Sequence, residues 1–420
     1  MNLDPSPATL RVAQFTDNYG PGSNGLTVAV HSLEGNLLDA GHEVIVVAPA
    51  AKGANPHKGR PGRTELRLPS TWVPRVPTRV ATGRHFERTI ARLAHLKPDV
   101  IHVHGFGTVG ALGTIAAQRL GIPLLLTWHT DFDAYAEHYR QWLPLLDWVL
   151  KAFVKLSRGA LVDEEEMRAA QIKFEDRGYG ASLIGMCAKM LELSHLVTTP
   201  SPKTAAHCRQ IAPGANVRVV PNGVDALPDG PEPFPRPDGP LVMYAGRIAP
   251  EKGITLLAEA FQLVANQRPD AKLMVVGDWD NNPTIRHALE TGRDQGLFIL
   301  PGEQRRDDLG RFYGMADVFA FPSQTDTQAL VLHEAALAGL PIVSVDHELT
   351  LVIDPPVNGE ITRPTPASLA AGILRVIDRL DNPAWREGAA HRSRELASQW
   401  TIASQAAEML QIYRDLAEQA

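Results

Sequence analysis

Short runs of apolar residues recur along the chain, and a helix-like segment follows most of them. The runs are RVAQFT, EVIVVAP, DVIHVHG, PLLLTWH and LVTTPS in the N-terminal half, then LVMYAGR, KLMVVGD, LFILPG, DVFAFPS and PIVSVD. Nearly continuous apolar strands that alternate with helices are typical of parallel sheets with helices on both faces. The pattern predicts an α/β fold made of two doubly wound domains.

A stretch dense in Pro, Gly and Asp, residues 221–240, separates the two sets of strands. Such composition is typical of a connection between domains. At 420 residues the chain is also longer than one hydrophobic core usually supports. We predict an N-terminal domain over 1–221, a linker over 222–240 and a C-terminal domain over 241–400. A last helix at about 400–420 is expected to return to the N-terminal domain.

Composition excludes several classes of protein. With 41 basic and 47 acidic side chains the formal charge is -6, so there is no global attraction to nucleic acid or to an anionic membrane. The only cysteines, Cys187 and Cys208, are too few for a disulfide framework and lack metal-ligand spacing. The N-terminus has no signal-peptide pattern, and no apolar run approaches the roughly 20 residues of a membrane span. We expect a cytoplasmic protein without a metal site.

Two segments interrupt the alternation of strands and helices. Residues 158–185 suggest an extra helical excursion. The other segment is rich in arginine and poor in acids, and it either faces lipid or an anionic acceptor, or forms a solvated basic loop followed by a surface helix. Its arginines are Arg60, Arg63, Arg67, Arg75, Arg79, Arg84, Arg88 and Arg92.

Ligands of doubly wound sheets bind beyond the carboxyl ends of the strands, so the residues after each run are the candidates for chemistry. In YAGRIAPEKG, glycine ends the strand, and Arg247 and Lys252 converge where a helix is expected to begin at Ile254. Two cations near a helix N-terminus suit a diphosphate, although surface cations without a function are common.

Three further candidates lie in the N-terminal half. The loop NYGPGSNG contains Gly25 and either admits a ligand to the backbone or is a plain turn. His129 follows a buried strand and either donates to a substrate hydroxyl or is structural. His102 and His104 alternate in IHVHG and are expected to point to the same face of the sheet.

The stretch SQTDTQALVLHEAALAG places Asp326 and Glu334 eight positions apart. Its capping residues predict a helix from near Thr327 to Gly339. Glu334 would then lie roughly 12 Å along the helix axis from Asp326, too far for a close acid/base pair. Because its neighbours are apolar, Glu334 is expected to meet hydroxyls or a cation, unless it is simply exposed.

In number and order, these motifs resemble the retaining glycosyltransferases of family 4, which have the GT-B architecture of two facing Rossmann-like domains. The resemblance also rests on VVPNGVD, on the GEQ turn and on ADVFAFPS. It implies metal-free transfer with retention and no protein nucleophile. In it His129, Asp326, Arg247 and Lys252 are catalytic, with the diphosphate on Arg247 and Lys252. The implied UDP-sugar donor site comprises Gly25, Arg247, Lys252, Gly302, Glu303, Gln304, Thr327, Gln328, Ala329, Leu330 and Glu334. Asp326 departs from the glutamate that is usual in the family.

A narrower resemblance concerns the acceptor. QFTDNYGPGSNGLTVAV, HVHGFGT, LTWHTDFDAYAEHY and TTPSPKTAA are similar to the 2-deoxystreptamine N-acetylglucosaminyltransferases of aminoglycoside antibiotic biosynthesis. This implies UDP-N-acetylglucosamine as donor, no further cofactor and 2'-N-acetylparomamine as product. An aminocyclitol dication fits acidic residues after the strands. These residues are Asp17, Asp131, Asp133 and Glu137.

Three other functions stay open at this point. A family 4 enzyme could instead glycosylate a membrane lipid such as phosphatidylinositol or diacylglycerol, supported only by the arginine-rich stretch. The chain could be a non-catalytic sensor of nucleotide sugars, or a nucleotide-sugar epimerase on a similar scaffold.

Overall fold

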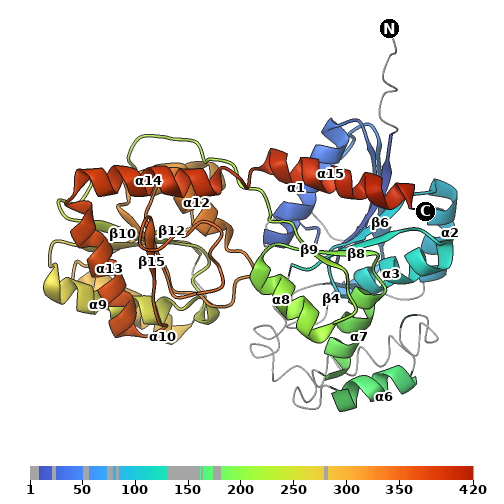
Figure 1. Cartoon of the computed structure of the whole chain (residues 1–420), viewed down its shortest axis with the longest axis horizontal. Coiled ribbons are helices and arrows are strands. Elements are labelled where there is room, and N and C mark those ends of the chain that lie inside the picture. The colour runs from blue at the N-terminus through green and yellow to red at the C-terminus, as the bar shows by residue number, and fades with distance from the viewer. Residues whose placement is uncertain are drawn as a thin grey trace, which may run out of the picture. The chain divides into compact units, whose positions relative to one another are not determined.

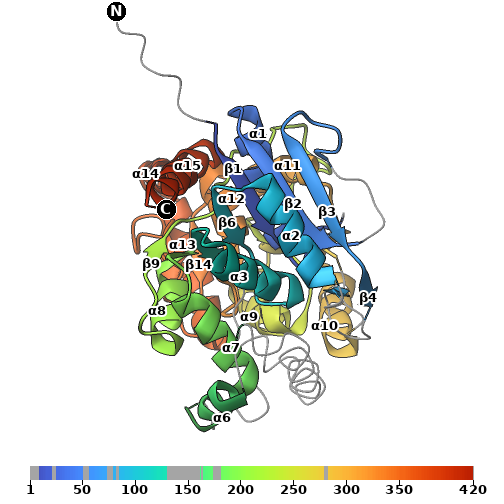
Figure 2. The same ribbon diagram turned by 90° about the vertical axis from the view of Figure 1, so that its right-hand side faces the viewer.

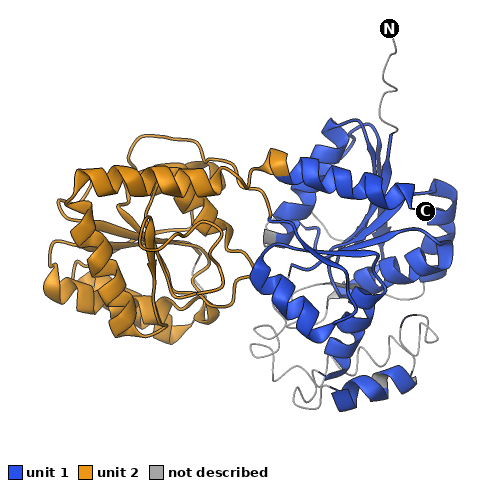
Figure 3. Ribbon diagram, viewed as in Figure 1, with its two compact units in different colours: residues 1–221, 405–420 blue, residues 222–404 orange. Residues whose placement is uncertain are grey.

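The structure is a computed structural model that describes residues 9–20, 25–50, 56–72, 79–81, 85–129, 161, 164–173, 181–278 and 282–419. The chain divides into two compact units (Figure 3). The first contains residues 1–221 and 405–420, and the second contains residues 222–404. Each unit is built around its own parallel sheet, so the doubly wound α/β prediction is confirmed.

The first unit has a seven-stranded sheet in the order β3-β2-β1-β6-β7-β8-β9, and every neighbouring pair is parallel. All five apolar runs predicted in this half form strands. The bounds are β1 Arg11–Phe15, β2 Glu43–Pro49, β3 Arg63–Leu68, β6 Val100–Val103, β7 Leu124–Thr127, β8 Leu196–Thr199 and β9 Val217–Val219. A short antiparallel pair, β4 (Ser70–Trp72) and β5 (Arg79–Ala81), stands apart from this sheet.

Helices cover both faces of this sheet. One face is packed by α1 (Gly25–Asp39) and by α15 (Ile402–Glu418), whose apolar side chains share a core with β1 and β2. The other face is packed by α2 (Phe86–Leu96), α3 (Thr108–Leu120), α7 (Ala181–Glu192) and α8 (Pro202–Ile211). Figure 2 shows α2 and α3 lying across the strands. The last helix therefore returns to the N-terminal sheet.

The segment predicted as an extra excursion contributes α6 (Glu164–Lys173) outside this layer (Figure 1). The helix packs on α7 so closely that a Cβ at Gly185 would lie 2.1 Å from the Ala170 Cβ. Gln171 Nε2 donates to Ser182 Oγ at 2.9 Å. Within its described part, the excursion is thus a helix attached to the core helix α7.

The second unit has a six-stranded parallel sheet in the order β12-β11-β10-β13-β14-β15. The five apolar runs predicted here all form strands, and β15 is an addition. The bounds are β10 Leu241–Ala245, β11 Lys272–Val276, β12 Phe298–Gly302, β13 Val318–Phe321, β14 Ile342–Ser344 and β15 Gly359–Ile361. One face packs against α9 (Ile254–Gln267), α10 (Pro283–Asp294) and α13 (Pro366–Leu380). The other packs against α11 (Leu309–Met315) and α12 (Leu330–Ala338), with α14 (Pro383–Ala397) beside α12.

Residues 222–240 form neither helix nor strand, in keeping with their Pro and Gly content. Their first part lies against the segment that joins α14 to α15, because Val224 N donates to Trp400 O at 2.8 Å. A Cβ at Gly223 would lie 2.4 Å from Thr401 O, so only glycine fits at this close approach. Both stretches of chain that pass between the units are thus bonded to each other within the second unit.

Candidate functional site

The candidate site of the second unit lies at the carboxyl ends of its central strands. After β10 the chain reaches Gly253, whose φ of 71° is left-handed, and α9 begins at Ile254 as predicted. A Cβ at Gly253 would lie 2.3 Å from Pro322 O, which follows β13. Glycine therefore lets the loop after β10 pack directly on the loop after β13.

A cation and a carboxylate join these two loops. Lys252 Nζ lies 2.6 Å from Asp326 Oδ1, and Ser323 Oγ donates to Asp326 Oδ2 at 2.6 Å. Thr325 Oγ1 adds a hydrogen bond of 3.2 Å to the carbonyl of Glu251. The Lys252 and Asp326 side chains are each 20% exposed, so water screens the pair only in part. The structure thus brings together two residues that are 74 positions apart.

Arg247, the second predicted diphosphate ligand, lies on the same loop. Its guanidinium is bonded to Glu251, and its side chain remains 59% exposed. Each of the two cations thus has a carboxylate partner, which leaves this part of the site electrically balanced. An anionic ligand that bound here would take over a partner from Glu251 or Asp326.

The helix after β13 begins later than its sequence indicates. The structure starts α12 at Leu330 rather than near Thr327, because Ala329 adopts a left-handed conformation with φ 59° and ψ 78°. Asp326 therefore lies in the loop before the helix. Glu334 lies inside the helix, four residues or about 6 Å along the axis from its first residue, Leu330.

Glu334 is 4% exposed, so the alternative of simple surface exposure is wrong. Its Oε2 accepts a hydrogen bond from the Tyr313 hydroxyl at 2.9 Å, and its Oε1 lies 2.7 Å from Arg306 NH1. Burial raises the pKa of Glu334, while the Arg306 guanidinium and the Tyr313 hydroxyl act in the opposite direction. The expected hydroxyl and cation are both present, although neither residue was named from the sequence.

The GEQ turn of the implied donor site, residues 302–304, lies at the end of β12. Gly302 has a left-handed φ of 78°, and Glu303 is exposed. Gln304 Nε2 donates to Pro301 O at 2.9 Å, which folds the side chain back on its own turn. The turn lies at the same edge of the sheet as the other candidates, since all the strands are parallel.

In the first unit, His129 follows β7 and is neutral near pH 7, because burial lowers its pKa to about 4. Its Nε2 lies 3.4 Å from His104 Nδ1. The His104 ring lies 3.8 Å from the His102 ring, which confirms that these two histidines share a face. His102 in turn contacts the Tyr413 hydroxyl at 2.7 Å, which connects the histidine cluster to α15.

Asp17 has a structural role that its sequence did not reveal. Its side chain is buried, and it accepts hydrogen bonds from Val109 N at 2.9 Å and Gly110 N at 3.3 Å. It therefore anchors the N-terminus of α3, and its contact with the acceptor stays a prediction. The other proposed acceptor ligands, Asp131, Asp133 and Glu137, lie outside the described residues, and Gly25 is the first residue of α1.

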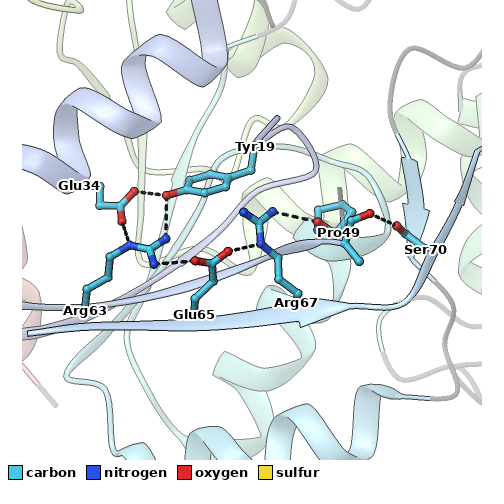
Figure 4. Close-up of polar contacts among 8 residues, drawn as sticks. Tyr19, Glu34, Pro49, Arg63, Glu65, Arg67 and Ser70 are labelled. Atoms are coloured by element: carbon cyan, nitrogen blue, oxygen red, sulfur yellow. Dashed lines mark hydrogen bonds and ion pairs between the residues drawn. The ribbon is translucent and has the colours of Figure 1, made fainter. Parts of the chain in front are cut away.

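The arginine-rich stretch is a strand in its first part and not a basic loop. On β3, Arg63 and Arg67 pair with Glu65, and Arg63 also pairs with Glu34 of α1 at 2.5 Å (Figure 4). The Tyr19 hydroxyl donates to Glu34, which ties the glycine-rich loop to this cluster. The charges of Arg63 and Arg67 are neutralised by those of the two glutamates, so these arginines are not available to bind lipid. The exposed remainder includes Arg88 and Arg92 on α2.

Comparisons with known proteins agree with this geometry. The model for "Glycosyltransferase Family 4" matches residues 23–226, and that for "Glycosyl transferases group 1" matches residues 239–379. The solved structure of sucrose-phosphate synthase from Thermosynechococcus elongatus superimposes with a TM-score of 0.70 over 98% of this chain and 100% of that one, at 21% identity, which establishes the fold.

The chain is a family 4 glycosyltransferase with the GT-B fold. Its relatives include an alpha-monoglucosyldiacylglycerol synthase from Acholeplasma laidlawii, 24% identical over 80% of both chains. A GDP-mannose-dependent alpha-mannosyltransferase from Mycolicibacterium smegmatis is 28% identical over 80% of both chains. A D-inositol 3-phosphate glycosyltransferase from Xylanimonas cellulosilytica is 28% identical over 94% of this chain and 93% of the relative.

No described helix has the length and apolar character needed to cross a membrane. The same part of the chain contains no group of three or more His, Cys, Asp or Glu side chains placed to hold a metal ion.

Proposed function

We propose that this glycosyltransferase moves a hexose, with retention of anomeric configuration, from a nucleoside-diphosphate sugar held by the second unit. The observation that carries the proposal is the Lys252–Asp326 pair, with Arg247 on the adjoining loop and the N-terminus of α12 four residues away. Cations and helix amides at one edge of a parallel sheet suit a diphosphate.

In this proposal the same groups stabilise the leaving diphosphate. Arg247 and Lys252 neutralise its charge, and backbone amides at the start of α12 donate to its oxygens. The carboxylates Glu251 and Asp326 hold the two cations until the donor arrives, and Asp326 then accepts from the sugar hydroxyls. The leaving phosphate oxygen helps to take the acceptor proton, so the reaction needs neither a protein nucleophile nor a metal ion.

Glu334 is proposed to accept from the ribose hydroxyls. The donor would take the place of Tyr313 or Arg306, which satisfy the same carboxylate at 2.9 and 2.7 Å. His129 of the first unit is proposed to hydrogen-bond the sugar as a neutral imidazole. The remaining donor contacts are assigned by resemblance to Gly25, Gly302, Gln304, Thr327, Gln328, Ala329 and Leu330.

UDP-N-acetylglucosamine is the donor proposed from the sequence, and GDP-mannose is the competing candidate because relatives are named for it. Asp326 has a shorter side chain than the glutamate that is usual in the family, so its contact with the donor sugar is expected to differ from the usual one. Isothermal titration of UDP and GDP against the purified chain distinguishes the two nucleotides. Binding of neither nucleotide would overturn the donor site itself.

For the acceptor, we favour a glycerolipid hydroxyl. Two relatives are named as alpha-monoglucosyldiacylglycerol synthases, and a third as a sulfoquinovosyl transferase. The helix α2 also buries Phe86, Ile90 and Leu93 while it exposes Arg88 and Arg92, and such a basic face would be attracted to anionic lipid.

Transfer to 2-deoxystreptamine is the second candidate. Its support is the resemblance of the loops after β1, β6 and β7, and it is weakened because Asp17 is committed to α3. Mass spectrometry of products formed with diacylglycerol vesicles or with 2-deoxystreptamine decides between the acceptors. A hexosylated lipid supports the first candidate, and 2'-N-acetylparomamine supports the second. Nucleotide-sugar binding without turnover on any acceptor would indicate a sensor.

A further inference from the structure

The loop between β13 and α12 is hydrogen-bonded to Asn222 through one buried side chain, that of Gln328. Gln328 is 3% exposed, and its amide is directed at Asn222, the first residue of the second unit. Gln328 Oε1 accepts from Asn222 N and from Asn222 Nδ2, both at 2.8 Å. Gln328 Nε2 donates to Asn222 O at 2.9 Å and lies 3.3 Å from His333 Nε2. These contacts use both lone pairs and both N–H groups of the amide.

The orientation of the Gln328 amide is fixed by its partners. A backbone N–H can only donate and a carbonyl can only accept, so Oε1 must face Asn222 N and Nε2 must face Asn222 O. His333 accommodates the remaining N–H, because burial lowers its pKa to about 4 and leaves Nε2 free to accept. The loop and Asn222 are therefore held in one relative arrangement.

Asn222 belongs to an assembly that includes both connections between the units. Val224 N donates to Trp400 O at 2.8 Å, and Ile402 N donates to Asp225 Oδ1 at 3.1 Å. Gln328 joins this assembly to the loop that carries Asp326 and to the start of α12. A change in the loop can therefore reach the linker through the hydrogen bonds of one amide.

We propose that Gln328 is a positioning residue for glycosyl transfer, which couples the donor loop to the linker at Asn222. Resemblance places Gln328 along the donor, but its side chain is directed to Asn222. A nucleotide that settles on residues 326–330 then orders residues 222–225 through this amide. The inference rests on the proposed donor site. It adds that Gln328 is the residue through which nucleotide binding at that site affects the linker.

Hydrogen exchange on the full chain tests the coupling, with UDP and GDP as probes. In the wild type, saturating nucleotide should slow exchange at the amides of residues 222–225 by at least about fivefold, because bonded amides exchange through local opening. Gln328→Ala keeps the backbone of residues 327–330, through which these residues are proposed to contact the donor, and removes a side chain bonded to Asn222. It should therefore bind nucleotide within about threefold of the wild type yet lose this protection, with about a tenfold lower kcat and little change in donor KM. Gln262→Ala is the matched control, since it removes an exposed glutamine–glutamine bond of 2.7 Å elsewhere in the unit.

A second variant guards against loss of folding in Gln328→Ala. Asn222→Ala keeps both backbone contacts to Gln328 and removes the Nδ2 bond to it, so its kcat should fall by about threefold. The double variant should be no slower than Gln328→Ala, because both changes act on one contact. If the kcat losses of the two single variants multiplied in the double variant, the inference would be wrong.

The outcomes separate this inference from the proposed donor site. Protection of residues 323–330 by nucleotide without protection of residues 222–225 would leave the donor site standing and overturn the coupling. Equal protection of the linker in the wild type and in Gln328→Ala would overturn it as well. Absence of any protection by UDP or GDP would overturn both the donor site and the coupling.

Discussion

Lys252 Nζ lies 2.6 Å from Asp326 Oδ1, so the cation proposed for the diphosphate and the carboxylate proposed for the sugar are bonded to each other. Each residue thereby holds its partner in place, and neither is left as an isolated charge in a half-buried loop. The pair, with the bond from Thr325 to the Glu251 carbonyl, therefore stabilises the contact between the two loops. It also means that donor binding must exchange one ionic contact for another.

Replacement of Lys252 by alanine should lower kcat/KM for the donor by roughly 10²–10³-fold, because the variant loses a cation aimed at charge that develops on the leaving group. Steady-state release of nucleotide diphosphate measures the effect. Lys272→Ala is the control, since Lys272 is in the same unit and donates to Gly296 O at 2.8 Å, at the amino end of β11. A loss of less than threefold in Lys252→Ala would contradict the assignment.

Glu334→Gln should change the pH dependence of stability. Burial raises the pKa of Glu334 above that in the unfolded chain, so its contribution to stability is greatest below the unfolded pKa and is lost as the pH rises through the folded pKa. The wild type should therefore lose stability relative to Glu334→Gln as the pH rises from 4.5 upward. Urea unfolding of both proteins at several pH values measures the difference, and a difference independent of pH would contradict the expectation.

Ala329→Gly should stabilise the protein by up to about 1 kcal/mol. Ala329 has a φ of 59°, a left-handed conformation that costs an L-residue roughly 1–2 kcal/mol, and part of this gain is offset by the greater entropy of glycine in the unfolded chain. Chemical denaturation gives the free energy of unfolding. Ala335→Gly, in the buried interior of α12, should destabilise by about 1 kcal/mol or more. Destabilisation by both variants would show that the Ala329 conformation carries no strain.

Glu34→Ala should destabilise the first unit by about 3–5 kcal/mol, because it leaves Arg63 buried with one carboxylate fewer. The Glu34 and Arg63 side chains are 0% and 5% exposed. Glu43→Ala removes a partner of Arg11 in a pair that is 37% and 42% exposed, and it should cost no more than about 1 kcal/mol. Thermal and urea unfolding measure both variants. If Glu34→Ala and Glu43→Ala lowered the free energy of unfolding equally, burial would not be what makes the Arg63 pair more stabilising.

Much of the fold was predictable because each apolar run had to be a strand buried on both faces. Strand β3 escaped prediction since RTELRL is half charged, and its arginines meet their acids only in the folded protein. The start of α12 was misplaced for a related reason. Its capping residues predict a start near Thr327, but Ala329 adopts a left-handed conformation that delays the helix to Leu330, and nothing in the sequence marks that conformation at an alanine.

The candidate site was partly predictable for the same physical reasons. Residues that follow buried parallel strands gather at one edge, so Arg247, Lys252 and Asp326 could be proposed together. The partners of Glu334 could not be named, because Arg306 and Tyr313 come from different elements that only packing brings to α12. The contact of Asp17 with α3 could not be predicted, because an acid after a strand can cap a neighbouring helix as readily as it can bind a ligand.

The charged strand β3 has a further consequence at the border of its sheet. It is the outermost strand of seven, so one side of its backbone has no neighbouring strand in that sheet. Exposed strand borders invite pairing with another chain, and charged side chains discourage it. Arg63, Glu65 and Arg67 stand on one face of β3 and satisfy one another within the molecule. A foreign strand would have to disturb that network, so the same cluster that holds the glycine-rich loop also protects the protein against aggregation.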